Sequence, residues 1–293
     1  MVSFEYYAPQ SLEEALSILN NQGNDAKVLA GGTDLIVQMK DGRLRPSVIV
    51  DVKRLPELNR LEWNNHTLYI GAAIQLSRIV AFPAVRERFG MLYQACNLIG
   101  SMQLRNRATI GGNICNAAPS ADTAPSLLCL GAKAIIARTG ATRLVPMESF
   151  FRGPGETVVE HDELLMGIEI PAIDTRWAGY YLRHTPRQDM DISVASVASL
   201  LILDKKENQC REARIALGAV APIPIRVPKA ESELAGQMLT SELIEKVAEI
   251  VEAAAQPISD VRGSAKYRIE LVKVLFTRTF QKALETLAAR NRK

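Results

Sequence analysis

Residues 28 to 35 read Val-Leu-Ala-Gly-Gly-Thr-Asp-Leu, and residues 109 to 113 read Thr-Ile-Gly-Gly-Asn. In both stretches two glycines follow apolar residues. Glycine reaches backbone conformations that are closed to other residues, and its amide can come close to a bound anion. One Gly-Gly pair is most often a tight turn. Two such pairs in one half of a chain favour an anion-binding site there.

The residues around these stretches alternate between helix and strand patterns. Ser11 to Glu14 form a capping box, and apolar residues at helical spacing follow until Gly23. Residues 27 to 30 predict a buried strand, Gly31-Gly32 a turn, and Thr33-Asp34 the caps of the next helical segment. Further strands are predicted at 47–52, 68–74, 134–137 and 164–170, and helices at 84–99 and 120–130.

After Pro171 the pattern changes, and a domain boundary is expected between residues 171 and 177. Beyond it, residues 178–184, 192–203 and 211–220 predict three antiparallel strands, with a polar turn at 204–209 and helices after the third strand. Two apolar stripes at helical spacing are expected to face the core. They consist of Leu243, Ile244, Val247, Ile250 and Val251, and of Tyr267, Leu271, Val274 and Leu275.

The composition excludes several classes of protein. The 293 residues are 47% hydrophobic, enough for two ordinary domains. The net charge is only +3 and the basic residues are scattered, which argues against binding to nucleic acid or an anionic membrane. No apolar run approaches the about 20 residues of a membrane span, and the amino terminus lacks an export signal. We therefore expect a cytoplasmic protein.

The motifs that are missing restrict the chemistry further. The chain has neither G-x-G-x-x-G nor G-x-x-x-x-G-K-[ST], so a Rossmann or P-loop nucleotide site is disfavoured. His66, His161 and His184 have no partners at ligand spacing, so neither a metal site nor a catalytic triad is expected. The four cysteines are far apart, and Cys115 is expected to be a small packed side chain.

Four short motifs carry a resemblance to a known family. They are Ala-Gly-Gly-Thr-Asp at 30–34, Gln-Leu-Arg-Asn at 103–106, Thr-Ile-Gly-Gly-Asn at 109–113 and Pro-Ser-Ala-Asp at 119–122. In order and spacing the chain resembles the FAD-binding subunit of the xanthine dehydrogenase and carbon monoxide dehydrogenase family. The resemblance extends to 162–165, 168–171 and 191–193, and so covers nearly the whole sequence.

The resemblance implies an α+β fold in two domains. Residues 1–175 would form an FAD-binding domain of the PCMH or vanillyl-alcohol-oxidase type, with subdomains at about 1–55 and 56–175. Residues 176–293 would form a C-terminal domain of the CO dehydrogenase flavoprotein type, with a three-stranded antiparallel sheet and helices.

The resemblance also implies which residues bind FAD. The first glycine stretch would wrap the pyrophosphate, with the amides of residues 30–34 and the Thr33 hydroxyl as donors. The second would form another backbone cradle. A bulky residue at Gly31 or Gly112 is then expected to abolish flavin retention. The residues concerned are Val28, Leu29, Ala30, Gly31, Gly32, Thr33, Asp34 and Leu35, followed by Thr109, Ile110, Gly111, Gly112 and Asn113.

Three further positions keep an alternative interpretation. Asp122 would accept hydrogen bonds from a sugar or ribityl hydroxyl, or would simply cap a helix. Leu165 matches a position that touches the cofactor, or is core. Arg183 stands where the family commonly has Lys near the flavin. It would stabilise the anionic reduced flavin, or would form a surface ion pair.

A subunit of this kind would transfer electrons and would need no catalytic side chain or metal of its own. By resemblance, a large subunit with a molybdenum cofactor and a small subunit with [2Fe-2S] clusters would be its partners in a dimer of heterotrimers. NAD or another acceptor would receive the electrons. The alternatives are a self-contained flavin oxidoreductase of the same fold and a flavin-free scaffold subunit. The substrate of the complex stays open.

Overall fold

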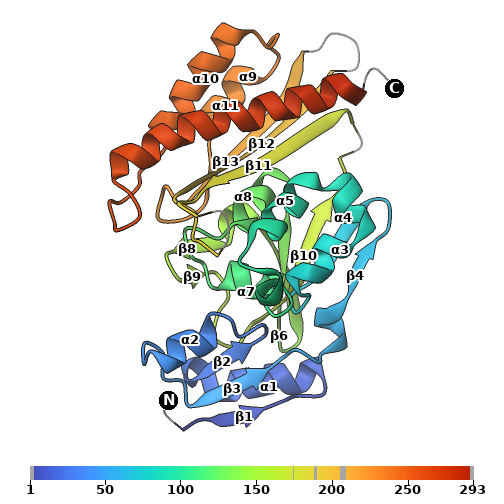
Figure 1. Ribbon diagram of the computed structural model, residues 1–293. Helices are drawn as coiled ribbons and strands as arrows, with labels where there is room; N and C mark the ends of the chain where they lie inside the picture. Colours follow the sequence, from blue (N-terminus) through green and yellow to red (C-terminus); the bar gives the residue numbers. More distant parts are fainter. Residues whose placement is uncertain (1–2, 174, 188–189, 205–208, 291–293) are drawn as a thin grey trace. The chain divides into compact units, whose positions relative to one another are not determined.

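The computed structural model describes residues 3–173, 175–187, 190–204 and 209–290, which fall into two units (Figure 1). The first unit takes in Met1–Phe82, Ser101–Ala117 and Ala132–Ala172. The second takes in Pro83–Gly100, Ala118–Gly131 and Ile173–Lys293. The chain therefore passes between the units several times before the C-terminal segment begins.

The first unit contains a small parallel sheet in the order β1-β3-β2, formed by β1 (Glu5–Tyr7), β3 (Val48–Asp51) and β2 (Ala26–Leu29). The predicted first helix is α1 (Leu12–Gln22), and the Ser11 side chain caps it by accepting a hydrogen bond from the Glu14 amide. The strand predicted at 27–30 is present as β2, but the expectation that it is buried is wrong. Lys27 and Val28 are exposed because β2 is an edge strand, whereas the central strand β3 is buried throughout.

A five-stranded antiparallel sheet forms the rest of the framework of this unit. Its order is β4 (Leu61–Trp63), β5 (Thr67–Gly71), β10 (Leu164–Pro171), β6 (Lys133–Arg138) and β7 (Ala141–Pro146). The predicted strand at 68–74 ends early, at Gly71. The remaining elements of the unit are short: α2 (Leu35–Lys40), α3 (Leu76–Ala81), α6 (Met102–Arg105), α7 (Ile110–Cys115), β8 (Phe151–Gly153), β9 (Glu156–Thr157) and the 3-10 turns η1 (Gly23–Asp25), η2 (Pro56–Asn59) and η3 (Met147–Ser149).

Glu163, next to the start of β10, makes a bidentate ion pair with Arg143 of β7. Arg143 Nε and Nη2 donate to the two carboxylate oxygens at 2.8 and 2.6 Å, and the Glu163 side chain is only 5% exposed. The Arg143 hydrogen bonds, opposed by burial, lower the pKa of Glu163 from its usual 4.5. The folded state therefore gains stability from this carboxylate above pH 4.5 and loses it as the pH falls through the lowered pKa.

We expect Glu163→Gln to lower the free energy of unfolding by about 1–2 kcal/mol at pH 7, because Arg143 is itself partly exposed. The difference from wild type should shrink towards zero as urea unfolding is repeated between pH 5 and pH 3. Glu87→Gln, an exposed position on α4 (Pro83–Arg88), is the control and should show little effect. A difference at Glu163 that stayed constant with pH would contradict this assignment.

The second unit is built on an antiparallel sheet in the order β11-β12-β13-β14. Its long strands are β11 (Trp177–His184), β12 (Ala195–Leu203) and β13 (Cys210–Gly218). These are the three strands expected from the sequence. The two-residue strand β14 (Ile225–Arg226) adds a fourth, too short to give a sequence pattern. Residues 205–208 of the predicted polar turn lie outside the described residues.

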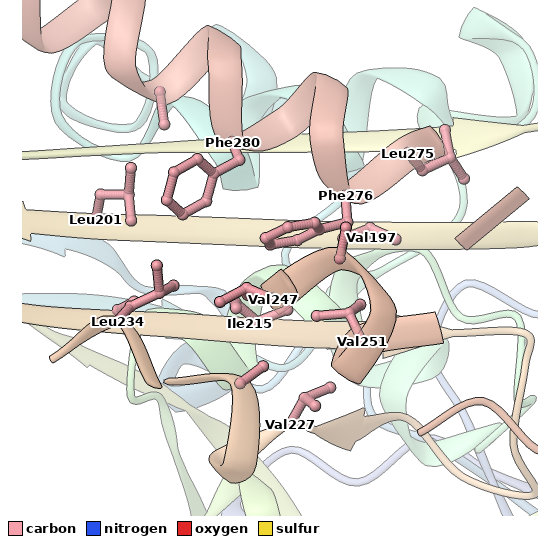
Figure 2. Close-up of a cluster of buried hydrophobic side chains, with 14 of the residues drawn as sticks. Val197, Leu201, Ile215, Val227, Leu234, Val247, Val251, Leu275, Phe276 and Phe280 are labelled. Atoms are coloured by element: carbon pink, nitrogen blue, oxygen red, sulfur yellow. The ribbon is translucent and has the colours of Figure 1, made fainter. Parts of the chain in front are cut away.

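Every residue of β12 is buried, because helices cover both faces of this sheet. On one face lie α9 (Pro228–Leu234), α10 (Ser241–Ala253) and α11 (Ala265–Arg290); Figure 2 shows Phe276 and Phe280 of α11 directed towards the sheet. On the other face, the Cys129 thiol of α8 (Thr123–Cys129) contacts the carbonyl oxygens of Ala198 and Arg214.

The predicted helical stripes are only partly correct. The α10 stripe does face the core, through Val247 and Val251. In α11, however, Tyr267 and Val274 are 42% and 43% exposed. Of the predicted stripe only Leu275 is fully buried, and the rest of the buried apolar face consists of Val272, Phe276, Phe280, Ala283 and Leu287. The sequence of α11 is compatible with two apolar faces, and only the packing of the helix determines which of them is buried.

The helices predicted at 84–99 and 120–130 are both shorter than expected. The first is two helices, α4 and α5 (Gly90–Leu98), separated at Phe89, whose φ and ψ of −123° and 48° are not helical. The second is α8, which starts after Asp122 and is followed by Gly131 at φ +67°. As expected, a left-handed glycine ends this helix.

Candidate functional site

The first glycine stretch forms a turn at the carboxyl end of β2, where ligands commonly meet a parallel sheet. Gly31 packs so closely on the segment before α7 that a Cβ there would overlap the Arg107 carbonyl oxygen and lie 2.9 Å from Ala108 Cα. Gly32 has φ +76°, a left-handed conformation. Glycine is thus required at both positions, for two different reasons.

The amides of this turn have no hydrogen-bond partners among the residues that the structure describes. Among the described residues, none of the backbone N–H groups of residues 30 to 35 donates a hydrogen bond, whereas the next amide, that of Ile36, bonds to the Gly32 carbonyl at 3.1 Å. Buried backbone donors are nearly always paired in folded proteins, and five of these six residues are partly buried. Successive amides in such a turn form a concave site for an anion.

Thr33 and Asp34 do not cap α2 as predicted. Asp34 occupies the N-cap position but makes no capping hydrogen bond, and the Thr33 hydroxyl donates to Asp34 Oδ2 at 3.2 Å. The amides of the turn are therefore left to an external acceptor.

The second glycine stretch begins α7 and differs from the first. The Thr109 side chain caps the helix by accepting from the Gly112 amide at 3.0 Å. The amides of Ile110, Gly111 and Asn113 donate to carbonyl oxygens of Ile74, Ala72 and Thr109 at 3.0–3.2 Å. The amides of residues 110 to 113 are therefore already used within the protein, and the second stretch does not offer the free donors that the first does.

What the second stretch contributes is close packing. A Cβ on Gly111 would lie 2.6 Å from the Ala72 carbonyl oxygen, whereas one on Gly112 would meet only Thr109 Oγ1, at 3.0 Å. Gly111 is thus the stricter requirement, and a substitution at Gly112 should be milder than the sequence suggested.

The structure adds a residue that the sequence analysis missed. Asn116, just after α7, donates from Nδ2 to Asp34 Oδ1 at 3.3 Å, and its own Oδ1 accepts from Gln38 Nε2 at 3.3 Å. These bonds connect the two glycine stretches, which are about 80 residues apart in sequence. Asn116 is one helical turn after Asn113, which is the signal that could have indicated it.

In the second unit, Asp122 is the centre of a buried polar cluster. Its Oδ1 accepts from Tyr181 Oη and Ser193 Oγ, each at 2.6 Å, and its Oδ2 accepts from Arg183 Nη1 at 2.6 Å. The alternative of a helix cap is wrong, since the side chain makes no capping bond. The alternative of a surface ion pair for Arg183 is also wrong, because the side chains of Arg183 and Asp122 are only 4% and 9% exposed.

Two properties of this cluster follow from its burial. Burial and the adjacent Asp122 carboxylate raise the pKa of Tyr181 well above its usual value, so Tyr181 stays a neutral hydrogen-bond donor. Among the described residues, the buried Arg183 Nη2 has no hydrogen-bond partner, while Nη1 is bonded to Asp122. Arg183 is therefore a fixed cation with one donor group unused.

Comparison with known proteins decides the family. Residues 2–173, more than half of the chain, match the model of a family described as the FAD binding domain in molybdopterin dehydrogenase. The chain belongs to this family. Residues 180–283 match a second model, the CO dehydrogenase flavoprotein C-terminal domain. The resemblance to FAD-binding medium subunits of xanthine and carbon monoxide dehydrogenases is thereby confirmed, together with the fold class and FAD as the cofactor of this chain.

The relatives of this FAD-binding chain include dehydrogenase subunits from bacteria and archaea. It is 33% identical over 282 residues to the carbon monoxide dehydrogenase medium chain of Hydrogenophaga pseudoflava, covering 96% of each chain. It is 36% identical over 279 residues to the glyceraldehyde dehydrogenase medium chain of Sulfolobus acidocaldarius, covering 95% of this chain and 97% of the relative. This chain is an FAD-containing oxidoreductase subunit.

Solved structures agree over nearly the full length of this FAD-binding chain. Carbon monoxide dehydrogenase from Hydrogenophaga pseudoflava, in a form that lacks the Mo-pyranopterin moiety of its cofactor, gives a TM-score of 0.93 at 31% identity, covering 97% of this chain and 99% of the other. Quinoline 2-oxidoreductase from Pseudomonas putida 86 gives 0.90 at 28% identity, covering 98% of each chain.

Four further features of this flavoprotein were considered from the sequence: Leu165, Cys115, metal ligands and membrane-spanning helices. Leu165 is buried in β10, at 3% exposure. Cys115 is exposed at the end of α7, so its expected packing is wrong. The described residues contain no cluster of His, Cys, Asp or Glu that could hold a metal ion. None of the described helices has the length and apolar character needed to cross a membrane.

Proposed function

We propose that this chain is the FAD-binding, electron-transfer subunit of a multi-subunit molybdenum hydroxylase. The observation that carries the proposal is the run of six unpaired amides at residues 30–35, which lies within the part of the chain that matches the FAD-binding family. A diphosphate is the anion that such a run of donors suits, and FAD contains one. FAD, when bound, supplies electron-transfer chemistry that no side chain of the protein possesses.

In the proposed FAD site, different residues of the first unit have different roles. The amides of residues 30–35 would donate to the diphosphate, and the Thr33 hydroxyl would add a contact. Gly31 and Gly111 allow the two glycine stretches to pack closely on neighbouring backbone, so that the turn is fixed before the cofactor arrives. The segment from Thr109 to Asn113 would then form a wall of the site rather than a set of amide donors.

For Asp122, Leu165 and Arg183 the proposal rests mainly on the resemblance. Arg183 would be the cation that stabilises a reduced flavin, and its unused Nη2 is consistent with a role as a donor to a ligand. Asp122 already accepts three hydrogen bonds, so a sugar hydroxyl would have to share it. We propose the corresponding domains at 1–175, with subdomains at about 1–55 and 56–175, and at 176–293.

The names of the relatives support the assembly that we propose. Several are medium chains or FAD subunits of larger dehydrogenases, including a nicotinate dehydrogenase FAD-subunit and xanthine dehydrogenase FAD-binding subunits. We propose that this chain binds a large molybdenum-cofactor subunit and a small [2Fe-2S] subunit in a dimer of heterotrimers, and that it passes electrons from the clusters to NAD or another acceptor in the cytoplasm.

The visible absorption spectrum of the purified chain tests this proposal. We expect a flavin spectrum, release of FAD on denaturation, and bleaching on anaerobic addition of NADH if NAD is the acceptor. A flavin that is not bleached by NADH would favour a quinone or oxygen as the acceptor. A colourless chain that does not take up added FAD would contradict the proposal and favour the scaffold alternative. Direct reduction by a small organic substrate without partner subunits would favour the self-contained enzyme.

A further inference from the structure

A chain of side-chain hydrogen bonds runs from the glycine turn to the end of α7. The Thr33 hydroxyl donates to Asp34 Oδ2 at 3.2 Å, Asn116 Nδ2 donates to Asp34 Oδ1 at 3.3 Å, and Gln38 Nε2 donates to Asn116 Oδ1 at 3.3 Å. All four residues belong to the first unit. The chain thus reaches from the turn that we propose to hold a diphosphate to a separate helix.

The Asp34 carboxylate is a potential competitor of a bound anion for the amides of the turn. It lies within the run of unpaired amides at residues 30–35, and short carboxylate side chains readily accept hydrogen bonds from nearby backbone amides. A carboxylate turned onto these amides would use the donors and add a negative charge where a diphosphate should bind. In the structure it does neither, because its two oxygens accept from Asn116 and Thr33 instead.

Asn116 is well placed to hold this carboxylate because α7 is itself held at both ends. At its start the helix is capped by Thr109 and bonded to the backbone of Ala72 and Ile74. At its end the carbonyl of Ala117, the residue after Asn116, accepts from the Gly155 amide at 3.0 Å. The Asn116 side chain is further oriented by Gln38, which leaves its Nδ2 to donate to Asp34.

We propose that Asn116 is a positioning residue for the cofactor: it holds the Asp34 carboxylate away from the amides of the glycine turn and so keeps them open to the diphosphate. This inference rests on the proposed function, because it concerns the same site. Its effect is exerted through Asp34, so the two residues must be coupled.

An exchange of the two side chains tests this coupling. In the double variant Asn116→Asp/Asp34→Asn, the amide at 34 can donate to the carboxylate at 116, which still accepts from Gln38, while the carbonyl at 34 still accepts from Thr33. The net charge is that of wild type. The single variant Asn116→Asp places two carboxylates face to face, whereas Asp34→Asn removes the carboxylate that needs to be held.

The flavin is removed from the full chain, and the chain is then titrated with FAD. The change in flavin fluorescence gives the dissociation constant for FAD. We expect Asn116→Asp to raise this constant about tenfold or more and Asn116→Ala about fivefold, with a change below about threefold for Asp34→Asn. The double variant should return to within about threefold of wild type. Asn97→Asp, which adds the same charge at an exposed position of the second unit, is the control and should leave FAD binding unchanged.

The possible results distinguish a failure of this inference from a failure of the proposed function. If wild type binds FAD and Asn116→Asp binds it equally well, or if the double variant is as weak as Asn116→Asp, the positioning role of Asn116 is wrong. The second result would indicate a direct contact between Asn116 and the cofactor. If wild type takes up no FAD at all, the proposed function itself fails. Thermal unfolding of each variant checks that a loss of binding does not come from a loss of fold.

Discussion

Replacing Gly31 with alanine is expected to weaken FAD binding by at least about 100-fold. The new Cβ would overlap the Arg107 carbonyl oxygen and lie 2.9 Å from Ala108 Cα, both backbone atoms that cannot rotate away. The turn would have to move, and its amides with it. Loss of two hydrogen bonds to a charged group, each about 1.5 kcal/mol or more, corresponds to this factor. Titration of the apo chain with FAD measures the change.

A matched pair of glycines separates the loss of FAD from a general strain on the fold. Gly32 and Gly140 have nearly the same positive φ, +76° and +74°, so alanine strains the backbone equally at both. Gly32 lies in the amide turn, where a new Cβ would lie 2.9 and 3.0 Å from the ends of the Ile36 and Leu29 side chains, which can move aside. Gly140 lies in the β6–β7 turn with no atom within 4 Å of a new Cβ. Gly32→Ala should weaken FAD binding and Gly140→Ala should not. Unchanged FAD affinity in Gly31→Ala would refute the placement of the diphosphate.

Replacing Asp122 with alanine is expected to lower the free energy of unfolding by about 3–5 kcal/mol, as is usual when one partner of a buried ion pair is removed. The change would leave Arg183 Nη1, Tyr181 Oη and Ser193 Oγ without the acceptor that all three share, in a region where both charged side chains are less than 10% exposed. Urea unfolding of the apo chain measures this loss independently of any cofactor.

Two comparisons test the cause of this loss. Glu62→Ala breaks an ion pair with Arg60 in which both side chains are 55% exposed, and should have little effect. Asp122→Ala/Arg183→Met removes both buried charges and should recover part of the stability that Asp122→Ala loses. A loss in Asp122→Ala no larger than that in Glu62→Ala would show that the buried cluster does not stabilise the second unit.

Local signals in the sequence were sufficient for most elements of the fold. The capping box at Ser11 predicted α1, and runs of apolar residues bounded by turn signals predicted the long strands β10 to β13. These features depend on near neighbours in the chain, so they are readable without the tertiary structure. The order of strands and the choice between two apolar stripes on α11 depend on distant contacts and were not readable in this way.

The candidate site, too, was only partly predictable from the sequence. The glycine motifs located the amide turn and led to the correct family and cofactor. They gave the same role to both motifs, although the amides of the first are unpaired and those of the second are bonded to residues 72, 74 and 109. The assignment of individual residues to FAD stays a prediction. For Asn116 the only signal in the sequence was its position one helical turn after Asn113, and the three donors around Asp122 had none.

By itself, therefore, the sequence determined the family, FAD as the cofactor, and the location of the glycine turn, because these follow from short motifs and their spacing. The tertiary structure alone decided which amides are open to a ligand, which side chain holds the Asp34 carboxylate, and that Asp122 and Arg183 form a buried pair. The reason is physical: whether a donor is free, or a charge is buried, depends on residues that are distant in the chain and close only after folding.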